Sequence, residues 1–573
     1  MRGTAKQRVR RLIVIVAASA AALALPSVAH AETMKAMSAA DFRDSIGINT
    51  HASYFDTAYG DWPRVVDKLE SLGIEHLHDA AFANPDWGDW NERYYQAVEL
   101  AAAHGMRFTV VMGEPNNPGG TLDQLIAIAA GRLHNAIDGL EGPNEYDLFH
   151  DSPNWPNELR DYQRALYAKA KADPVLRHLP LLGPSLVFPD SDPKLGPLPD
   201  ALDAGNIHPY TGGDQPSAGH TNFQADEARR VSGTKPMWAT EAGYHNALAA
   251  SQGQPPVSED VAASYVLRVY LEHFKAGLVR TYMYEAVDEK PDPALIEPES
   301  HFGLLRNDFS EKPAFTSLKR MLQLIGHPAE TTPGTLDLGL GGDTTSVQHL
   351  LLKRSDNRYV LAFWQGEKEW DPQLRHPLFP PDRSVRLTLP TTAQVSVTRP
   401  THGAGATSLG NLREVPLSVP ADPTFVELEF PPGAKLPTGK PVVPGTGGGG
   451  TPGTGVPGTA CPSLKPGGLV LEKAGVKARV RPDRSRRRTV RFELCANNGG
   501  NAMVEVRGAH GRLLAKRTLS TTGGREATVK VGWTKKSARA GLLKGRAVTA
   551  RLRYLPEGAT SAIVLAGRVA GLR

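Results

Sequence analysis

Two glutamates follow apolar, strand-like runs and are the residues in this 573-residue chain best placed to do covalent chemistry. Glu145 ends the segment Leu140-Glu141-Gly142-Pro143-Asn144-Glu145, and Glu241 ends Ala239-Thr240-Glu241, 96 residues later. Two carboxyl groups about 5 Å apart can cleave a glycosidic bond with retention, because one protonates the leaving oxygen while the other attacks the anomeric carbon. The pattern therefore predicts a retaining pair of glutamates.

The motifs around these glutamates occur in an informative order. Asn144-Glu145, the strand end Ile207-His208-Pro209-Tyr210 and then Glu241 resemble the clan A glycoside hydrolases, near the cellulase-like and β-xylosidase-like families. The resemblance covers residues 41–328. It implies that Glu145 is the acid/base after barrel strand four and Glu241 the nucleophile after strand seven. It also implies that Asn144 binds the sugar 2-hydroxyl and that Tyr210 donates a hydrogen bond to the nucleophile.

Other interpretations of these residues remain open. Glu141 is a rival acid four residues before Glu145, although it lacks the asparagine neighbour and would lie inside the strand. Both glutamates could also be solvated carboxylates, because Glu is usually exposed. His208 would point to the same side of its strand as Tyr210, so it is a substrate-binding candidate, with a structural role as the alternative.

Further polar residues at strand ends are candidates for contacts with sugar hydroxyls. The chosen ones are His78 and Asp79 at strand two and Tyr284 at strand eight; weaker ones are Asn49, His51, Glu114, Asn116 and Glu285. Trp87, Trp90 and Trp155 could stack on sugars or, as Trp usually does, pack inside the protein. Many clan members carry an arginine where this chain has His78-Asp79 and a tryptophan where it has Tyr282 and Tyr284. The sugar is therefore not identified.

A scaffold of parallel βα units would bring these residues together. Between residues 41 and 328, short apolar runs alternate with amphipathic helical stretches. We expect strands over Ile46–Asn49, His76–Ala80, Arg107–Met112, Ala136–Leu140, Leu181–Leu186, Ala204–Ile207, Pro236–Thr240 and Val279–Tyr284. Eight such strands predict an α/β fold, a (β/α)8 TIM barrel, with both glutamates at the carboxyl ends of strands, where such barrels hold their active sites.

Composition divides the rest of the chain. Residues 1–31 have a basic start, an apolar stretch and an Ala29-His30-Ala31 cleavage pattern, so they predict a signal peptide. Residues 32–330 form the expected catalytic barrel, 331–432 a β-sandwich accessory domain, 433–460 a Gly/Pro/Thr-rich linker and 461–573 a separate β-rich module. No later run is long enough to span a bilayer, so we expect a secreted, extracellular or cell-wall-associated protein without membrane insertion.

The C-terminal module differs from the barrel in charge and in cysteine content. Residues 461–573 carry 25 Lys and Arg against 6 Asp and Glu, whereas residues 32–460 carry 35 against 54. Cys461 and Cys495 are the only cysteines, and in an exported protein they are expected to form one disulfide, worth about 3 kcal/mol. The basic run at 479–488 makes an anionic cell-wall or capsular polymer a candidate partner. A solvated basic face, or a sugar-binding module using Trp533 and Tyr554, is the alternative.

Several kinds of chemistry find no support in the motifs. The chain has no HExxH pair, no calcium-loop spacing and no GxxxxGK[ST] phosphate loop, so we expect no metal site, no cofactor and no nucleic-acid partner. The sequence thus predicts an exported retaining glycoside hydrolase that cleaves poly- or oligosaccharides, with β-linkage implied by the resemblance. A non-catalytic carbohydrate-binding or surface-adhesion protein on the same scaffold is the alternative, and a transglycosylase would use the same residues.

Overall fold

The computed structural model describes residues 31–436, except 151, 189 and 404, and the strands of a C-terminal part between residues 469 and 569. The chain divides into two compact units, Met1–Val443 and Pro444–Arg573. Residues 1–30 of the predicted signal peptide and 437–460 of the predicted linker lie outside the described residues. Within the described part, no helix has the length and apolar character needed to cross a membrane.

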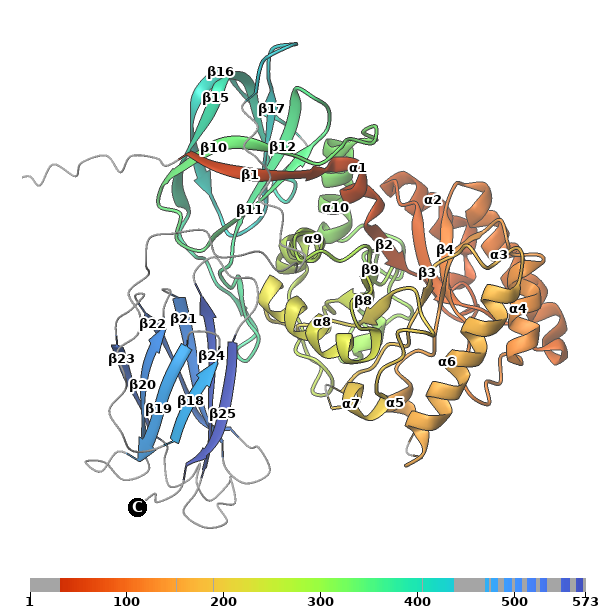
Figure 1. Cartoon of the computed structure of the whole chain (residues 1–573). Coiled ribbons are helices and arrows are strands. Elements are labelled where there is room, and N and C mark those ends of the chain that lie inside the picture. The colour runs from red at the N-terminus through yellow and green to blue at the C-terminus, as the bar shows by residue number, and fades with distance from the viewer. Residues whose placement is uncertain are drawn as a thin grey trace, which may run out of the picture. The chain divides into compact units, whose positions relative to one another are not determined.

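A parallel eight-stranded sheet forms the barrel of the first unit (Figure 1). Its strand order is β6-β5-β4-β3-β2-β9-β8-β7, and a bridge between Leu182 and Ala204 nearly closes the ring. The strands are β2 (Ile46–Asn49), β3 (His76–Ala80), β4 (Arg107–Val111), β5 (Ile137–Glu141), β6 (Leu181–Leu182), β7 (Gly205–Ile207), β8 (Met237–Gly243) and β9 (Thr281–Tyr284). The eight predicted strands are all present, although β6 is much shorter than expected.

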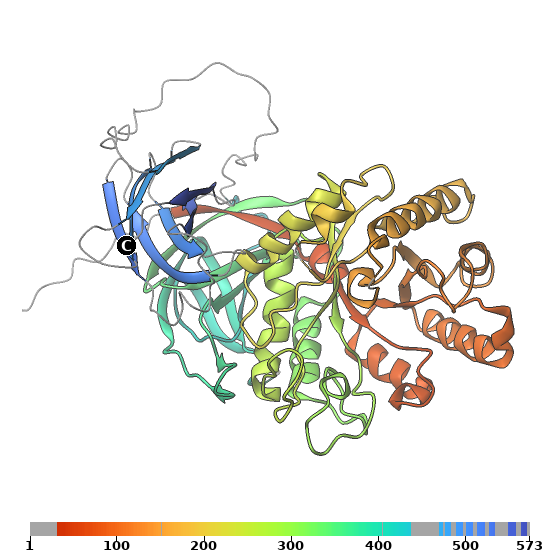
Figure 2. The same ribbon diagram turned by 90° about the horizontal axis from the view of Figure 1, so that it is seen from below.

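Helices cover the outside of the barrel strands (Figure 2). The longer ones are α2 (Trp62–Leu72), α3 (Gly88–Ala103), α4 (Leu122–Ala130), α6 (Trp155–Ala172), α8 (Ala218–Ser232), α9 (Glu259–Lys275) and α10 (Pro313–Ile325). Short helices are α1 (Ala39–Asp44), α5 (Tyr146–Phe149) and α7 (Asp192–Leu195). Helix α2 shows why these segments are helical, since its apolar residues at three- to four-residue intervals are all buried and its end is marked by Gly73 at φ 84°.

A charged network joins the amino-terminal ends of the barrel strands. The ring nitrogens of His76 lie 2.8 Å from Oδ2 of Asp138 and 2.9 Å from Oδ1 of Asp44. Arg280 donates to the same two carboxylates at 3.1 and 2.9 Å. The hydrogen bond from His76, with the nearby charge of Arg280, holds the pKa of Asp44 below its usual range. This end of the barrel is thus fixed by paired charges, away from the predicted site.

The accessory domain is one sheet that closes on itself, where the sequence predicted a two-layer sandwich. Its strand order is β10-β1-β11-β12-β17-β15-β16, and β10 also pairs with β15. The strands are β1 (Ala31–Ser38), β10 (Gly334–Gly342), β11 (Val347–Lys353), β12 (Arg358–Gln365), β15 (Arg383–Thr398), β16 (Thr407–Val419) and β17 (Thr424–Glu429), beside a small β13 (Trp370–Asp371) and β14 (His376–Pro377) hairpin. The long β15 pairs with β10 through one half and with β17 through the other.

The first strand corrects the predicted domain boundary. Residues of β1, expected to begin the barrel, instead lie between β10 and β11 of the accessory sheet, as the red strand in Figure 1 shows. The two domains also share a core. Trp364 is fully buried and donates to Oε1 of Glu272 on α9 at 2.8 Å, while Trp370 donates to the carbonyl of Pro256 at 2.8 Å. The accessory sheet therefore supports the barrel helix that precedes β9.

The C-terminal unit contains two four-stranded antiparallel sheets, ordered β18-β19-β20-β23 and β22-β21-β24-β25. Their strands are β18 (Leu469–Lys473), β19 (Val476–Pro482), β20 (Thr489–Ala496), β21 (Gly500–Arg507), β22 (Leu513–Thr521), β23 (Glu526–Gly532), β24 (Val548–Pro556) and β25 (Ile563–Val569). The predicted disulfide depends on Cys461 and on the side chain of Cys495, which lie outside the described residues, as does Trp533.

Candidate active site

Glu145 lies in the loop after β5 and has an unusual backbone conformation. Its φ of 44° is in the left-handed region, which costs a non-glycine residue on the order of 1 to 3 kcal/mol. The segment that follows β6 holds this loop, because the backbone N–H of Glu145 donates to Oγ of the buried Ser185 at 3.2 Å. The Ser185 hydroxyl in turn donates to Oδ1 of Asn144 at 3.3 Å. Ser185 thus holds the backbone of the loop at Asn144 and Glu145.

The same loop needs a glycine where it passes helix α6. A Cβ added to Gly142 would meet Oε1 of Gln163 at 2.1 Å and the backbone nitrogen of Pro184 at 2.9 Å. Gln163 is fully buried and donates to the carbonyl of Ala201 at 2.9 Å, so it has little freedom to move. The close approach of the chain at Gly142 sets the position from which Glu145 enters the site.

Glu145 and Glu241 are brought together by the fold. A carboxylate oxygen of each lies within 4.8 Å of the other and of a ring nitrogen of His208. The two side chains remain 17% and 14% exposed, so a substrate can reach both. Tyr210, after β7, donates its hydroxyl to Oε2 of Glu241 at 2.7 Å. These oxygens are closer together than the carboxyl groups of inverting glycosidases, which lie about 6.5 to 9.5 Å apart.

His208 lies between the two glutamates. Its Nδ1 is 2.7 Å from Oε1 of Glu145 and 3.6 Å from Oε2 of Glu241, while its Nε2 is 3.0 Å from Oγ1 of Thr240. Burial opposes charge on the ring, but Glu241 and the hydrogen-bonded Glu145 prevail and raise the pKa of His208 to about 9. At neutral pH His208 is therefore an imidazolium shared by the two carboxylates, which makes it a positioning residue.

The protonation of Glu241 depends on this histidine. Burial raises the pKa of Glu241, the charge of His208 lowers it, Glu145 raises it further and the hydrogen bond from Tyr210 lowers it. His208 and Tyr210 thus favour the ionised form of Glu241, whereas burial favours its protonated form.

A polar layer lies directly beneath the pair and contains Glu141. Glu141 is fully buried and accepts from Nδ2 of Asn206 at 2.7 Å and Oγ1 of Thr240 at 3.1 Å, and lies 2.7 Å from Nε2 of His78. A carboxylate enclosed in this way cannot reach a substrate, so Glu141 is excluded as the acid. Thr240 links this layer to His208, and Asn206 and Thr240 are the supporting residues that the sequence analysis missed. Asn206 lies two residues before His208, and Thr240 lies one residue before Glu241. This proximity in the sequence is the signal that could have identified them.

His78 and Asp79, which were predicted to contact substrate, are both buried. His78 is 4% exposed, and its other ring nitrogen lies 2.6 Å from Oδ1 of Asn49. Asp79 is 5% exposed and accepts from Oγ1 of Thr50 and the backbone N–H of Ala52, both at 2.8 Å. Burial raises the pKa of Asp79 to about 6. Asp79 is held by donors of the loop after β2, whereas His78 is held between Asn49 of β2 and Glu141 of β5.

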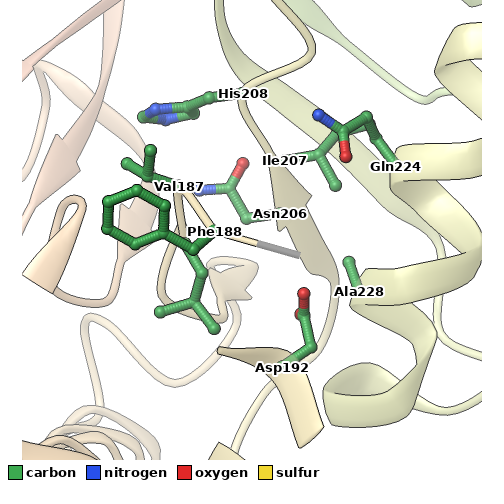
Figure 3. Close-up of a pocket in the computed structure, with 9 residues that line it drawn as sticks. Val187, Phe188, Asp192, Asn206, Ile207, His208, Gln224 and Ala228 are labelled. Atoms are coloured by element: carbon green, nitrogen blue, oxygen red, sulfur yellow. The ribbon is translucent and has the colours of Figure 1, made fainter. Parts of the chain in front are cut away.

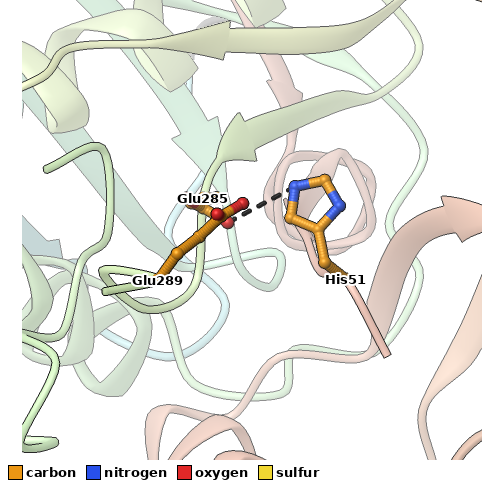
Figure 4. Close-up of side chains that lie close together, drawn as sticks. All are labelled: His51, Glu285 and Glu289. Atoms are coloured by element: carbon orange, nitrogen blue, oxygen red, sulfur yellow. Dashed lines mark ion pairs between the residues drawn. The ribbon is translucent and has the colours of Figure 1, made fainter. Parts of the chain in front are cut away.

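Tyr284, the last residue of β9, contacts His51, which forms a second cluster with Glu285 and Glu289 (Figure 4). Its hydroxyl donates to Oε2 of Glu299 at 3.2 Å and lies 3.2 Å from Nε2 of His51. Burial lowers the pKa of His51 to about 3 and raises the pKa of Glu285 well above its ordinary value. Burial thus favours the uncharged form of both groups at the close His51–Glu285 contact.

The remaining candidates have ordinary roles. Trp87 and Trp90 form a ring cluster with Phe82, at centroid distances of 6.2 and 5.1 Å, and Trp155 is in a hydrophobic core. Among the weaker ones, Asn49 donates into the barrel to the carbonyl of Thr240, Glu114 pairs with His150, and Asn116 is exposed.

A small pocket lies behind His208, between β7 and α8 (Figure 3). It is lined by residues that include Phe188, Asp192, Asn206 and Gln224, but not by Glu145 or Glu241. Burial, with Glu227 and Asp147 nearby, raises the pKa of Asp192 to about 7. The pocket is therefore separate from the face on which the two glutamates meet.

No protein-family model matches this chain, and no curated protein is found similar to it. Similar solved structures include a monomeric β-xylosidase from Caulobacter crescentus CB15, at 14% identity over 67% of this chain and 96% of that one, with a TM-score of 0.46. A GH39 enzyme from Xanthomonas axonopodis pv. citri is 15% identical over 67% and 94%, at 0.44, and a GH30 subfamily 8 xylanase from Clostridium acetobutylicum is 13% identical over 70% and 98%, at 0.42. These neighbours are clan A glycoside hydrolases. At such values the roles of residues rest on the geometry alone.

Proposed function

We propose that the barrel is a retaining glycoside hydrolase that acts on β-linked poly- or oligosaccharides by double displacement. The observation that carries the proposal is the pair of strand-end carboxylates, Glu145 and Glu241, with oxygens within 4.8 Å of one another. Glu145 would protonate the leaving oxygen while Glu241 attacks the anomeric carbon, and Glu145 would then act as base on water. Tyr210 and Asn144 would orient the nucleophile and the sugar.

The proton that Glu145 gives to the leaving group has a defined source. Nδ1 of His208 lies 2.7 Å from Glu145, and His208 carries a charge at neutral pH, so one proton is held at this contact. With the proton on Glu145, the neutral ring would leave Glu241 with the hydrogen bond from Tyr210. The three groups would therefore alternate between an acid-competent and a base-competent arrangement.

The proposal is tested on the full chain with a panel of 4-nitrophenyl β-glycosides. Glu145→Ala and Glu241→Ala should each lower kcat by about three orders of magnitude or more with the melting temperature little changed. Azide should rescue both variants and give different products. In Glu241→Ala it replaces the nucleophile and yields the α-glycosyl azide, whereas in Glu145→Ala it attacks the glycosyl-enzyme and yields the β-glycosyl azide.

Turnover near the wild-type rate in both variants would contradict the assignment, as would a time course by NMR in which the inverted sugar appears first. If the protein binds glycans on an array without cleaving any of them, the alternative of a carbohydrate-binding or adhesion protein is correct. Transfer of the sugar to an added glycan instead of water would identify a transglycosylase with the same residues.

Export and tethering are further parts of the proposal and are supported by the sequence alone. We propose that residues 1–31 direct secretion and that the basic residues 461–573 attract an anionic cell-wall or capsular polymer. A chain of residues 32–443 should hydrolyse small soluble substrates like the full protein but bind cell walls less. The difference should shrink as added salt screens the charges. Equal binding by both chains would rule out tethering by this module.

A further inference from the structure

We propose that His51, Glu285 and Glu289 form a binding site for a divalent transition-metal ion of the Zn²⁺ class. The three side chains converge at the ends of β2 and β9, and one ligand atom of each lies within 4.8 Å of the others. Figure 4 shows the carboxyl groups of Glu285 and Glu289 beside each other and facing the imidazole of His51. This set of donors lies outside the proposed catalytic pair.

One buried oxygen atom of the cluster has no interaction partner. Glu285 is fully buried, and its Oε1 has neither solvent contact nor a hydrogen-bond partner among the described residues. A buried carboxylate oxygen without a partner costs about 1 to 3 kcal/mol, so such atoms are rarely left alone. Nor does a lysine or arginine form an ion pair with Glu285 or Glu289 in the described part of the chain. A cation bound by Glu285 would supply the interaction that the protein does not.

The surroundings resemble those that orient metal ligands. Tyr59 donates its hydroxyl to Oε2 of Glu285 at 2.7 Å, which fixes the carboxylate, and the ring of His51 stacks on Tyr54 with centroids 4.4 Å apart. Tyr284 donates to Glu299, so it does not need the lone pair of His51. Hydrogen bonds such as the one from Tyr59 are common around carboxylates that bind metals.

The distances favour a small ion. Nε2 of His51 and Oε2 of Glu285 lie 3.4 Å apart, close to the separation of about 3.3 Å between two ligands that bind a tetrahedral Zn²⁺ at about 2.0 to 2.1 Å. An imidazole ligand favours Zn²⁺ over Ca²⁺, which takes oxygen ligands. His51 and Glu289 are partly exposed, so an ion can enter from their side, and water would complete its coordination.

The test is direct binding of Zn²⁺ to the metal-stripped full chain by calorimetry, without reference to activity. We expect one equivalent, bound at least tenfold more tightly than Ca²⁺, that is weakened tenfold or more in both His51→Gln and Glu289→Gln. Glu297→Gln, an exposed change in the same loop, should bind like the wild type. Circular dichroism and melting curves establish that each variant is folded.

The second histidine-and-glutamate cluster provides the decisive comparison. Glu145, His208 and Glu241 also lie within 4.8 Å of one another, and so could hold the ion instead. Under our proposal Glu145→Gln retains the site. Loss of the equivalent in Glu145→Gln but not in Glu289→Gln would overturn it. So would unchanged binding in both His51→Gln and Glu289→Gln, tighter binding of Ca²⁺ than of Zn²⁺, or no binding of Zn²⁺ to the wild type.

Discussion

Tyr210 donates a 2.7 Å hydrogen bond to Oε2 of Glu241, across the gap between β7 and β8. This bond opposes the effect of burial on the pKa of Glu241, as do the charges of His208 and His78. Two residues from one segment, His208-Pro209-Tyr210, therefore favour the ionised form of Glu241.

Tyr210→Phe should lower kcat about 10- to 100-fold, because a hydrogen bond to a charged group is worth about 1.5 to 3 kcal/mol. Since the hydroxyl lowers the pKa of Glu241, its removal should move the acidic limb of the kcat/KM profile to higher pH. Tyr244→Phe is the matched control, because the Tyr244 hydroxyl contacts Thr211 and Asp214 instead. An unshifted acidic limb in Tyr210→Phe would show that Tyr210 has no effect on ionisation of the nucleophile.

The stabilising contribution of a charged His208 should be lost at alkaline pH. Its pKa is about 9 in the folded chain against an ordinary value of 6.5. Such a group contributes its full stabilisation below pH 6.5 and loses it as the pH rises through 9. The gap in melting temperature between wild type and His208→Asn should therefore narrow from pH 6 to 10. The exposed His178→Asn should follow the wild type throughout, and parallel curves for His208→Asn would contradict the assignment of charge.

Asp192→Asn should stabilise the protein. Burial raises the pKa of Asp192 to about 7, so the wild type loses stability as the pH rises from about 4 through 7. A neutral asparagine avoids this loss. The variant's advantage in melting temperature should grow between pH 4 and 7 and then level off. Asp190→Asn, where the side chain is 78% exposed, should show no such trend. A variant that is less stable than the wild type at pH 8 would mean that the Asp192 carboxylate has an unrecognised partner.

Gly142→Ala should destabilise the chain by about 1 to 3 kcal/mol, because the added methyl group would collide with Gln163 and Pro184. The loop must shift to relieve the collision, so kcat should fall as Glu145 is displaced. Urea denaturation and steady-state kinetics measure the two effects. Gly219→Ala on α8 is the control, since its nearest neighbour is 4.0 Å away and alanine favours a helix. Full activity in Gly142→Ala would mean that the loop position does not set the geometry of Glu145.

The barrel was predictable because its signals are local. Apolar runs of four to six residues predicted the strands, and the residues that follow them predicted that Glu145, Tyr210 and Glu241 would meet. The predictions that failed concern how deeply a side chain lies within the barrel. His78 and Asp79 lie near a strand end, like Glu241, and only packing shows that their side chains are buried.

Contacts between segments that lie far apart along the chain could not be predicted from the sequence either. His51 precedes Glu285 and Glu289 by most of the barrel's length, so no motif links them, and the expectation of no metal site followed from motifs alone. Strand β1 was assigned to the barrel because it adjoins the barrel in the chain, whereas its partners are made from residues 334–353.

The place of β1 also constrains the order in which the chain can assemble during synthesis. The strand starting at Ala31 is made before the barrel, and β10, starting at Gly334, only after it. Because synthesis proceeds from the amino terminus, the barrel can be completed before β10 and β11 exist. Until then both edges of β1 are unpaired. The accessory sheet therefore closes last and joins residues 31–38 to residues 334–353, so that neither domain can be removed at one cut without opening a sheet.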